Sequence, residues 1–369
     1  MCLSRQNSKE VPPEKDMLIK GKIFISGIIF LLAAGLASAA GSNSASTKPD
    51  PFKMNRLLGR GVNLGNALEA PVEGQWGVVI KEEYFSIIKQ AGFNSVRIPV
   101  KWSGHALEEK PYTINPDFFK RVDTVIDWAM KNDLYVMLNI QRYDPLTDDP
   151  NSYHFERFVA LWEQIAEHYK DYPDYLVLEL YNEPYKALTP ELWNDLLKQT
   201  LPVIRKSNPN RTIVIEPTII IDPNFVVCLD KLKIPAEEKN VIVSVHYYTP
   251  LEFTHQGAPW MGKRSQAWVG TKWMATDAEK KVVTDFFDDA AKWGKENNRP
   301  MNLGEFGVYK KVDLGSRVRW TRFVAQTAAQ RGMSLLWWDF CAELAIYDRD
   351  TKSWNKEMLD AILSAKIAD

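Results

Sequence analysis

The feature that most constrains the fold is a repeated alternation of short apolar runs with longer segments of helical period. We interpret as strands the apolar runs at residues 61–65, 94–100, 134–140, 175–181, 211–217, 240–248, 300–307 and 333–340. Segments between them, such as 117–132 and 155–172, place apolar residues three and four positions apart, as amphipathic helices do. Because strands separated by helices pair in parallel, about eight such units over roughly 310 residues predict an α/β fold, a single-domain (β/α)8 TIM barrel.

An open doubly wound sheet is the alternative arrangement for this alternation, but its nucleotide-binding fingerprints are missing. The turn after the first run, GVNLGNALEA, has no GxGxxG pattern, and no GxxxxGK[ST] loop follows another run. The five histidines form no HxH or HExxH pair, and the cysteines form no CxxC pair. We therefore expect neither a cofactor nor a metal, and a formal charge of -1 gives no bias toward nucleic acid.

The first 40 residues predict an export signal that is not part of the fold. The apolar run 23–40 follows Lys20 and Lys22 and ends in the small-residue pattern ASA. It is shorter than the roughly 20 residues that a membrane span needs, so an anchor is the weaker alternative. An alternative start at Met17 would give the signal a conventional basic n-region. We expect a secreted or periplasmic protein, a monomer that is off the membrane after signal cleavage.

After the signal, residues 41–51 predict a flexible lead-in and residues 52–369 predict the folded domain. Signal removal would leave Cys228 and Cys341 as the remaining cysteines. Two cysteines predict no disulfide framework, although a single bridge between them stays open.

Polar and aromatic side chains recur where the predicted strands end, and active sites of (β/α)8 barrels lie at that end. These residues are Asn63, Arg97, Gln141, Asn182, Glu183, Glu216, His246, Tyr248, Glu305 and Trp338. Glu183 in YNEP and Glu305 in LGEFG end the fourth and seventh runs, so they would face each other across the barrel mouth. Gly304 and Gly307 are expected to leave room for a ligand there.

Paired carboxylates at such a mouth suit glycoside cleavage. One carboxyl group protonates the leaving oxygen and the other attacks the anomeric carbon, with roughly 5 Å between them when configuration is retained. For either glutamate taken alone, an ion pair at the rim is the structural alternative.

Six stretches of the sequence carry a family resemblance. They are GVNLGN, VRIPVKW, LYNEP, SVHYYTPLEFTHQGAPW, NLGEFG and LWWDF, in this order between residue 61 and about residue 340. Together they resemble glycoside hydrolase family 5, the cellulase-type retaining β-glycanases. The resemblance implies a (β/α)8 barrel that hydrolyses a polysaccharide or oligosaccharide by double displacement without a cofactor. It favours a β-1,4-glucan substrate and leaves mannanase, xyloglucanase and exo-glucosidase activity as alternatives.

The resemblance also implies roles for single residues. Glu183 matches the acid/base and Glu305 matches the nucleophile. The supporting residues are Asn182 for the sugar 2-hydroxyl, Arg97 and Tyr248 beside the nucleophile, His246 beside the acid/base and Trp338 as the floor under the sugar.

The third strand departs from the family pattern. Cellulase-like members end it in Asn-x-His-His, whereas LNIQRYD places Gln141 and Arg142 there. Gln141 could still hydrogen-bond a sugar hydroxyl. Arg142 either points away and pairs with a carboxylate such as Asp144 or enters the cleft, where its charge would favour an acidic sugar or alter affinity. These changes keep a non-catalytic carbohydrate-binding barrel open as an alternative, with a metal-dependent hydrolase as the third choice.

Other acidic and aromatic residues invite weaker interpretations. Glu216, which also ends an apolar run, is expected to be a rim residue or a sugar contact, and Glu179 is expected to belong to a buried hydrogen-bond network. Trp260 stands in a tryptophan-rich loop, residues 251–273, that predicts either sugar-stacking platforms or a small satellite core. Trp76 and Trp102 are further platform candidates.

Overall fold

The structure is a computed structural model that describes residues 50–221 and 225–368. The predicted export signal, residues 1–40, and residues 41–49 of the predicted lead-in lie outside the described residues. The described residues belong to one compact unit. Within these ranges, none of the helices has the length and apolar character needed to cross a membrane.

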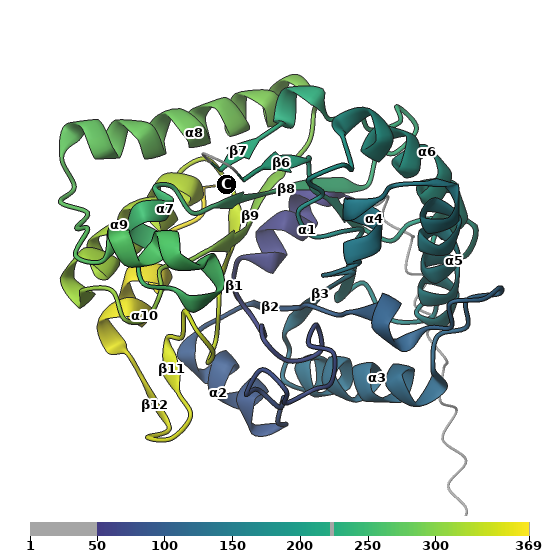
Figure 1. Cartoon of the computed structure of the whole chain (residues 1–369), viewed down its shortest axis with the longest axis horizontal. Coiled ribbons are helices and arrows are strands. Elements are labelled where there is room, and N and C mark those ends of the chain that lie inside the picture. The colour runs from purple at the N-terminus through teal and green to yellow at the C-terminus, as the bar shows by residue number, and fades with distance from the viewer. Residues whose placement is uncertain (1–49, 222–224, 369) are drawn as a thin grey trace, which may run out of the picture. The chain divides into compact units, whose positions relative to one another are not determined.

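A closed barrel of parallel strands forms the centre of this unit (Figure 1). Its strands are β1 (Arg60–Asn63), β2 (Ser95–Ile98), β3 (Tyr135–Asn139), β4 (Leu176–Glu179), β5 (Ile213–Ile215), β8 (Val241–Tyr247), β9 (Met301–Phe306) and β10 (Ser334–Trp337). Each strand overlaps one of the predicted runs, and β1 closes the barrel by pairing in parallel with both β2 and β10. The prediction of a (β/α)8 barrel is therefore confirmed, and the open sheet is excluded.

Helices surround the barrel strands (Figure 1). They are α2 (Glu83–Ala91), α3 (Pro116–Lys131), α5 (Ser152–His168), α6 (Pro190–Ser207), α8 (Asp277–Glu296), α9 (Leu314–Ala329) and α10 (Lys356–Leu363). α3 and α5 confirm the two amphipathic segments, and each begins where an asparagine side chain, Asn115 or Asn151, accepts hydrogen bonds from the first backbone N–H groups. α8 begins with a capping box between Thr276 and Glu279.

One connection departs from the regular alternation. In the described part of the segment between β5 and β8, a two-stranded antiparallel sheet of β6 (Ile219–Ile220) and β7 (Val226–Val227) and the short turn η2 (Leu229–Lys231) take the place of a helix. Pro217 and Pro235 lie near the two ends of this segment and disfavour a continuous helix, because proline interrupts helical hydrogen bonding.

Short elements occur mainly in the loops beyond the strand ends. They are η1 (Trp102–His105), α4 (Asp144–Asp148), α7 (Leu251–Thr254), η3 (Pro259–Met261), η4 (Lys263–Trp268) and the hairpin of β11 (Tyr347–Asp348) with β12 (Ser353–Trp354).

Two apolar layers hold the barrel together, because successive side chains of a strand point to opposite faces. In β3, Val136 and Leu138 belong to the large cluster between the strands and the helices, whereas Met137 belongs to a smaller inner cluster. Met54 and Leu58 of α1 (Pro51–Leu58) complete the inner cluster.

The prediction of a flexible lead-in over residues 41–51 extends too far toward the folded domain. Pro51 does not belong to a flexible lead-in, because it is the first residue of α1 and the Asp50 side chain caps that helix.

Candidate active site

The strand ends form a cleft of about 490 Å³ at the barrel mouth. Its lining includes Gln141, Arg142, Asn182, Glu183, Tyr248, Trp260, Glu305 and Trp338. The other two predicted site residues, Arg97 and His246, are buried and lie beneath these side chains. A larger hollow of about 940 Å³ lies between α6 and residues 233–240, away from these strand ends.

Glu183 and Glu305 approach each other across this cleft. A carboxylate oxygen of Glu183, a carboxylate oxygen of Glu305 and a ring nitrogen of His246 all lie within 4.8 Å of one another. The Glu183 side chain is 20% exposed and the Glu305 side chain is 6% exposed. Carboxylate oxygens this close suit an attacking carboxylate and a proton donor on one sugar ring, since the two carboxyl groups lie about 5–5.5 Å apart in retaining sites and about 6.5–9.5 Å apart in inverting sites.

Arg97 and Tyr248 fix the orientation of the Glu305 carboxylate. Arg97 Nη1 donates to Glu305 Oε1 over 2.5 Å, and the Tyr248 hydroxyl donates to Oε2 over 2.8 Å. Burial, followed by the charge of Glu305, raises the pKa of Tyr248 well above its usual range, so Tyr248 remains a hydrogen-bond donor. Arg97 also donates to both oxygens of Glu179, over 2.6 and 3.0 Å, which places Glu179 in the buried network that the sequence predicts.

Glu183 is held through both its main chain and its side chain. Its backbone φ is 45°, in the left-handed region that side chains other than glycine rarely adopt, at a cost of roughly 1–3 kcal/mol. Its backbone N–H donates to Glu216 Oε2 over 3.0 Å, and its Oε1 lies 2.8 Å from His246 Nδ1. Burial alone would lower the pKa of His246, but Glu216 and Glu305 raise it well above its usual range.

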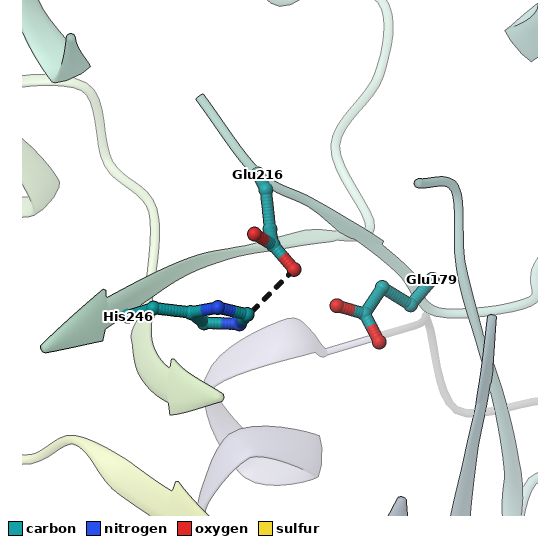
Figure 2. Close-up of side chains that lie close together, drawn as sticks. All are labelled: Glu179, Glu216 and His246. Carbon is teal, nitrogen blue, oxygen red and sulfur yellow. Dashed lines mark ion pairs between the residues drawn. The ribbon is translucent and has the colours of Figure 1, made fainter. Parts of the chain in front are cut away.

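Glu179, Glu216 and His246 form a buried cluster beneath Glu183 (Figure 2). His246 Nε2 lies 3.2 Å from Glu216 Oε1, an ion-pair distance, and Figure 2 shows that this oxygen also faces the Glu179 carboxylate. Although burial would raise the pKa of Glu179, the charge of Arg97 lowers it, whereas burial raises the pKa of Glu216 well above its usual range. Because a guanidinium already balances Glu179, this donor set has little unbalanced negative charge with which to hold a metal ion.

Two amide side chains present donors to the cleft. Asn182 Oδ1 accepts from Arg97 Nη2 over 2.8 Å, and Gln141 Oε1 accepts from Asn139 Nδ2 over 2.7 Å. Since both oxygens are engaged, each side chain has its NH2 group available for a sugar hydroxyl.

The structure combines parts of the two alternatives for Arg142, because the side chain pairs with Asp144 but does not point away from the cleft. Its guanidinium donates to Asp144 Oδ1 over 2.9 and 3.3 Å, as the ion-pair alternative predicts. It also lines the cleft, 5.9 Å from the ring centre of Trp76. Because Asp144 balances its charge, Arg142 adds hydrogen-bond donors to the cleft wall without making it strongly basic.

The predicted aromatic platforms divide between cleft and core. Trp338, Trp260 and Trp76 line the cleft, and Trp260 is 48% exposed. The prediction for Trp102 is wrong, because its ring is buried and its Nε1 donates to the Asn139 carbonyl over 3.0 Å. Trp273 is also buried and belongs to the large core cluster, so it fastens the loop 251–273 to the main core and not to a satellite core.

Two further predictions about the mouth are wrong. Gly304 makes room for protein side chains and not for a ligand, because a Cβ there would lie 2.4 Å from Ser244 Oγ and 3.0 Å from His246 Nε2. A Cβ at Gly307 would lie 2.2 Å from the Trp338 carbonyl oxygen. Glu216 is 1% exposed and does not line the cleft, so it is neither a rim residue nor a sugar contact.

Glu69 is a cleft residue that the sequence interpretation missed. It lines the cleft, and its carboxylate accepts hydrogen bonds from the backbone N–H groups of Asn66 and Ala67. Burial raises its pKa from 4.5 to about 7 despite these hydrogen bonds. Its place three residues after Asn66, in the loop beyond the first strand, is the signal that could have identified it.

We expect Glu69→Gln to change how stability depends on pH. A carboxyl group with a raised folded-state pKa stabilises the fold below its unfolded pKa, and this stabilisation is lost as pH rises through the folded pKa. Between about pH 4.5 and pH 7 the wild type should therefore lose stability relative to the variant, by about 3 kcal/mol at 1.4 kcal/mol per pKa unit. Urea unfolding of both proteins across this range measures the difference. A difference that stays constant with pH would contradict the raised pKa.

The fold and the site define a class: a (β/α)8 barrel that carries two closely spaced glutamates at its mouth. The chain belongs to glycosyl hydrolase family 5, since residues 60–344 match the model of that family, described as Cellulase.

Individual relatives agree with this assignment. The chain is 37% identical over 328 residues to Endoglucanase H of Acetivibrio thermocellus, an alignment that covers 87% of this chain and 34% of the relative. It is 50% identical, with a TM-score of 0.81, to structures of Thermotoga maritima Cel5A in complex with mannotriose and with cellobiose, covering 85% of this chain and all of the other. The chain spans about a third of the length of Endoglucanase H.

Proposed function

We propose that the chain is an endo-acting β-1,4-glucanase that cleaves its substrate with retention of configuration. In this proposal Glu183 protonates the leaving oxygen, and Glu305 attacks the anomeric carbon to form a glycosyl-enzyme. Glu183 then acts as the base that activates the water molecule. The observation that carries the proposal is the approach of the two carboxylates, with oxygens within 4.8 Å of each other.

The contacts around the pair suit these roles. Arg97 and Tyr248 hold the Glu305 carboxylate by two donors, so it is aimed before a substrate binds. Asn182 is placed to donate to a sugar 2-hydroxyl, an interaction that strengthens in the oxocarbenium-like transition state. Trp338 offers the apolar ring on which a sugar face can stack.

The relatives support a glucan as the substrate, with mannan as a second candidate. Endoglucanase H and other relatives carry endoglucanase names. Cel5A, at 50% identity, has been captured with a manno-oligosaccharide as well as with cellobiose. We therefore propose β-1,4-glucan first and β-1,4-mannan second.

Reducing-end release from a substrate panel tests the proposal. Carboxymethylcellulose and barley β-glucan should be cleaved, with mannan cleaved more slowly and xylan and xyloglucan serving as comparisons. Cleavage of mannan alone would reverse the order of the two candidates. If no polysaccharide or defined oligosaccharide released reducing ends, the proposed activity would be lost, and a carbohydrate-binding role would take its place.

We further propose that residues 1–40 direct export and that the domain, which begins with the α1 cap at Asp50, acts as a monomer. The apolar run after Lys20 and Lys22 and the small residues before position 40 support the export signal. Comparison of the mature N-terminus with the printed sequence tests the cleavage site.

A further inference from the structure

Glu216 is a buried carboxyl group that lies between the two partners of the proposed acid/base. It directly follows β5, is 1% exposed and lies outside the lining of the cleft. A carboxyl group in such a place is costly unless its oxygens have polar partners, so those partners indicate what the group does.

The two oxygens of Glu216 contact different parts of the site. Oε2 accepts the backbone N–H of Glu183 over 3.0 Å. Oε1 lies 3.2 Å from His246 Nε2, an ion-pair distance without hydrogen-bond geometry, and accepts a long hydrogen bond from Arg97 Nη2 over 3.5 Å. The other ring nitrogen of His246 lies 2.8 Å from Glu183 Oε1. One carboxyl group therefore reaches Glu183 by two routes, directly at the main chain and through His246 at the side chain.

The direct contact falls on a backbone conformation that needs support. Glu183 has a φ of 45°, and a residue other than glycine keeps such a conformation only where its surroundings impose it. The hydrogen bond from the Glu183 N–H to Glu216 is placed to impose it. Without this acceptor, Glu183 could relax toward a commoner conformation, and its side chain would leave its present direction.

We propose that Glu216 is a positioning residue for the acid/base step: it holds the main chain of Glu183 and the ring of His246 so that the Glu183 carboxyl group points at the leaving oxygen. This proposal rests on the proposed function, in which Glu183 is the acid. Glu216 itself touches no substrate.

The proposal predicts different effects on substrates that have different leaving groups. A sugar hydroxyl leaves only if it is protonated, whereas dinitrophenolate leaves readily as an anion. Damage to the acid step should therefore lower kcat/KM for cellotetraose and spare kcat/KM for 2,4-dinitrophenyl β-cellobioside. Because kcat/KM reports the steps up to formation of the glycosyl-enzyme, later hydrolysis of the intermediate does not obscure the comparison.

We expect Glu216→Ala to lower kcat/KM for cellotetraose by about 30- to 100-fold, because it misplaces the acid without removing it and so costs no more than the lower end of the roughly 10²- to 10⁴-fold that general acid catalysis contributes. It should change kcat/KM for the dinitrophenyl substrate by less than about 3-fold. Glu183→Ala provides the benchmark and should show the same selectivity with a larger loss. Glu216→Gln keeps an oxygen for the Glu183 N–H but places its NH2 group against other donors. Its kcat/KM should therefore fall about 10-fold for cellotetraose and stay unchanged for the dinitrophenyl substrate. If Glu216→Ala does not fold, Glu216→Gln takes its place in the comparison.

Glu238→Ala is the matched control. Glu238 is also buried and pairs with an arginine, Arg205, over 2.8 Å, but it lies outside the cleft. Glu238→Ala should change kcat/KM for both substrates by the same small factor. If the wild type and Glu183→Ala behave as stated but the Glu216 variants lose equally on both substrates, or lose nothing on cellotetraose, the positioning role is overturned. A wild type that cleaves neither substrate would overturn the proposed function and this proposal together.

Discussion

Replacement of Glu305 by alanine is expected to abolish hydrolysis of β-1,4-glucans, lowering kcat by roughly 10⁴-fold or more. A carboxylate oxygen of Glu305 lies within 4.8 Å of one of Glu183. Two donors, Arg97 and Tyr248, orient the Glu305 carboxylate. No other described carboxylate of the cleft has both features, so none can replace it as the attacking group. Release of reducing ends from carboxymethylcellulose by the purified variant measures the loss.

Chemical rescue separates a lost nucleophile from a damaged fold. Added azide should occupy the space left by the Glu305 carboxylate and restore turnover of an activated aryl cellobioside, with formation of the α-glycosyl azide. Glu238→Ala, which removes a buried glutamate outside the cleft, should retain activity within about 10-fold. Wild-type rates in Glu305→Ala would contradict the assignment of Glu305 as the attacking group.

Replacement of Arg97 by methionine is expected to have the largest effect on stability. Arg97 is fully buried and donates to Glu179, Glu305 and Asn182, so its loss leaves two carboxylates without their cation. Removal of one partner of a buried ion pair costs about 3–5 kcal/mol. Urea unfolding at pH 7 should show a loss of this size, and activity should fall with it.

The loss in Arg97→Met should shrink as the pH falls toward 4.5. In the wild type, Arg97 lowers the pKa of Glu179 below 4.5, so that the stability from its ionised form is present above pH 4.5 and lost only below it. Without Arg97, burial would raise that pKa, and the variant would lose stability as pH rises. Arg322→Met removes an exposed pair with Asp360 and should cost less than about 1 kcal/mol. A loss for Arg97→Met as small as that control would contradict the account.

The barrel could be predicted because its signal is local. Most barrel strands, such as β5 and β8, are rich in apolar residues, and the helices α3 and α5 show the period of an amphipathic helix over many residues. The segment between β5 and β8 shows the limit, since counting units predicts a helix where its described part forms β6, β7 and η2.

The site could be predicted as a set of strand ends but not as a set of contacts. Barrel order places Glu183 and Glu305 on opposing strands, whereas their separation depends on how each side chain turns. Gly304 and Gly307 illustrate the difference: the sequence indicates a need for space, and only the structure shows that Ser244, His246 and Trp338 occupy it.

Burial explains the misinterpretation of Glu216 and Trp102. Both stand just past strand ends, where exposed functional residues are common, and neither sequence neighbourhood reveals whether the side chain turns inward. For Glu216, the deciding contacts come from Glu183 and His246, which are 33 and 30 positions away along the chain and belong to other strand ends.

The configuration of the first sugar product tests the central claim most directly. Proton NMR of cellotetraose hydrolysis by the wild type, recorded before mutarotation, distinguishes the two anomers. Two carboxylates close enough to act on one ring from opposite faces should release the β-anomer first, through a glycosyl-enzyme on Glu305. Initial release of the α-anomer would require a water molecule between the carboxylates and would contradict the mechanism proposed for Glu183 and Glu305.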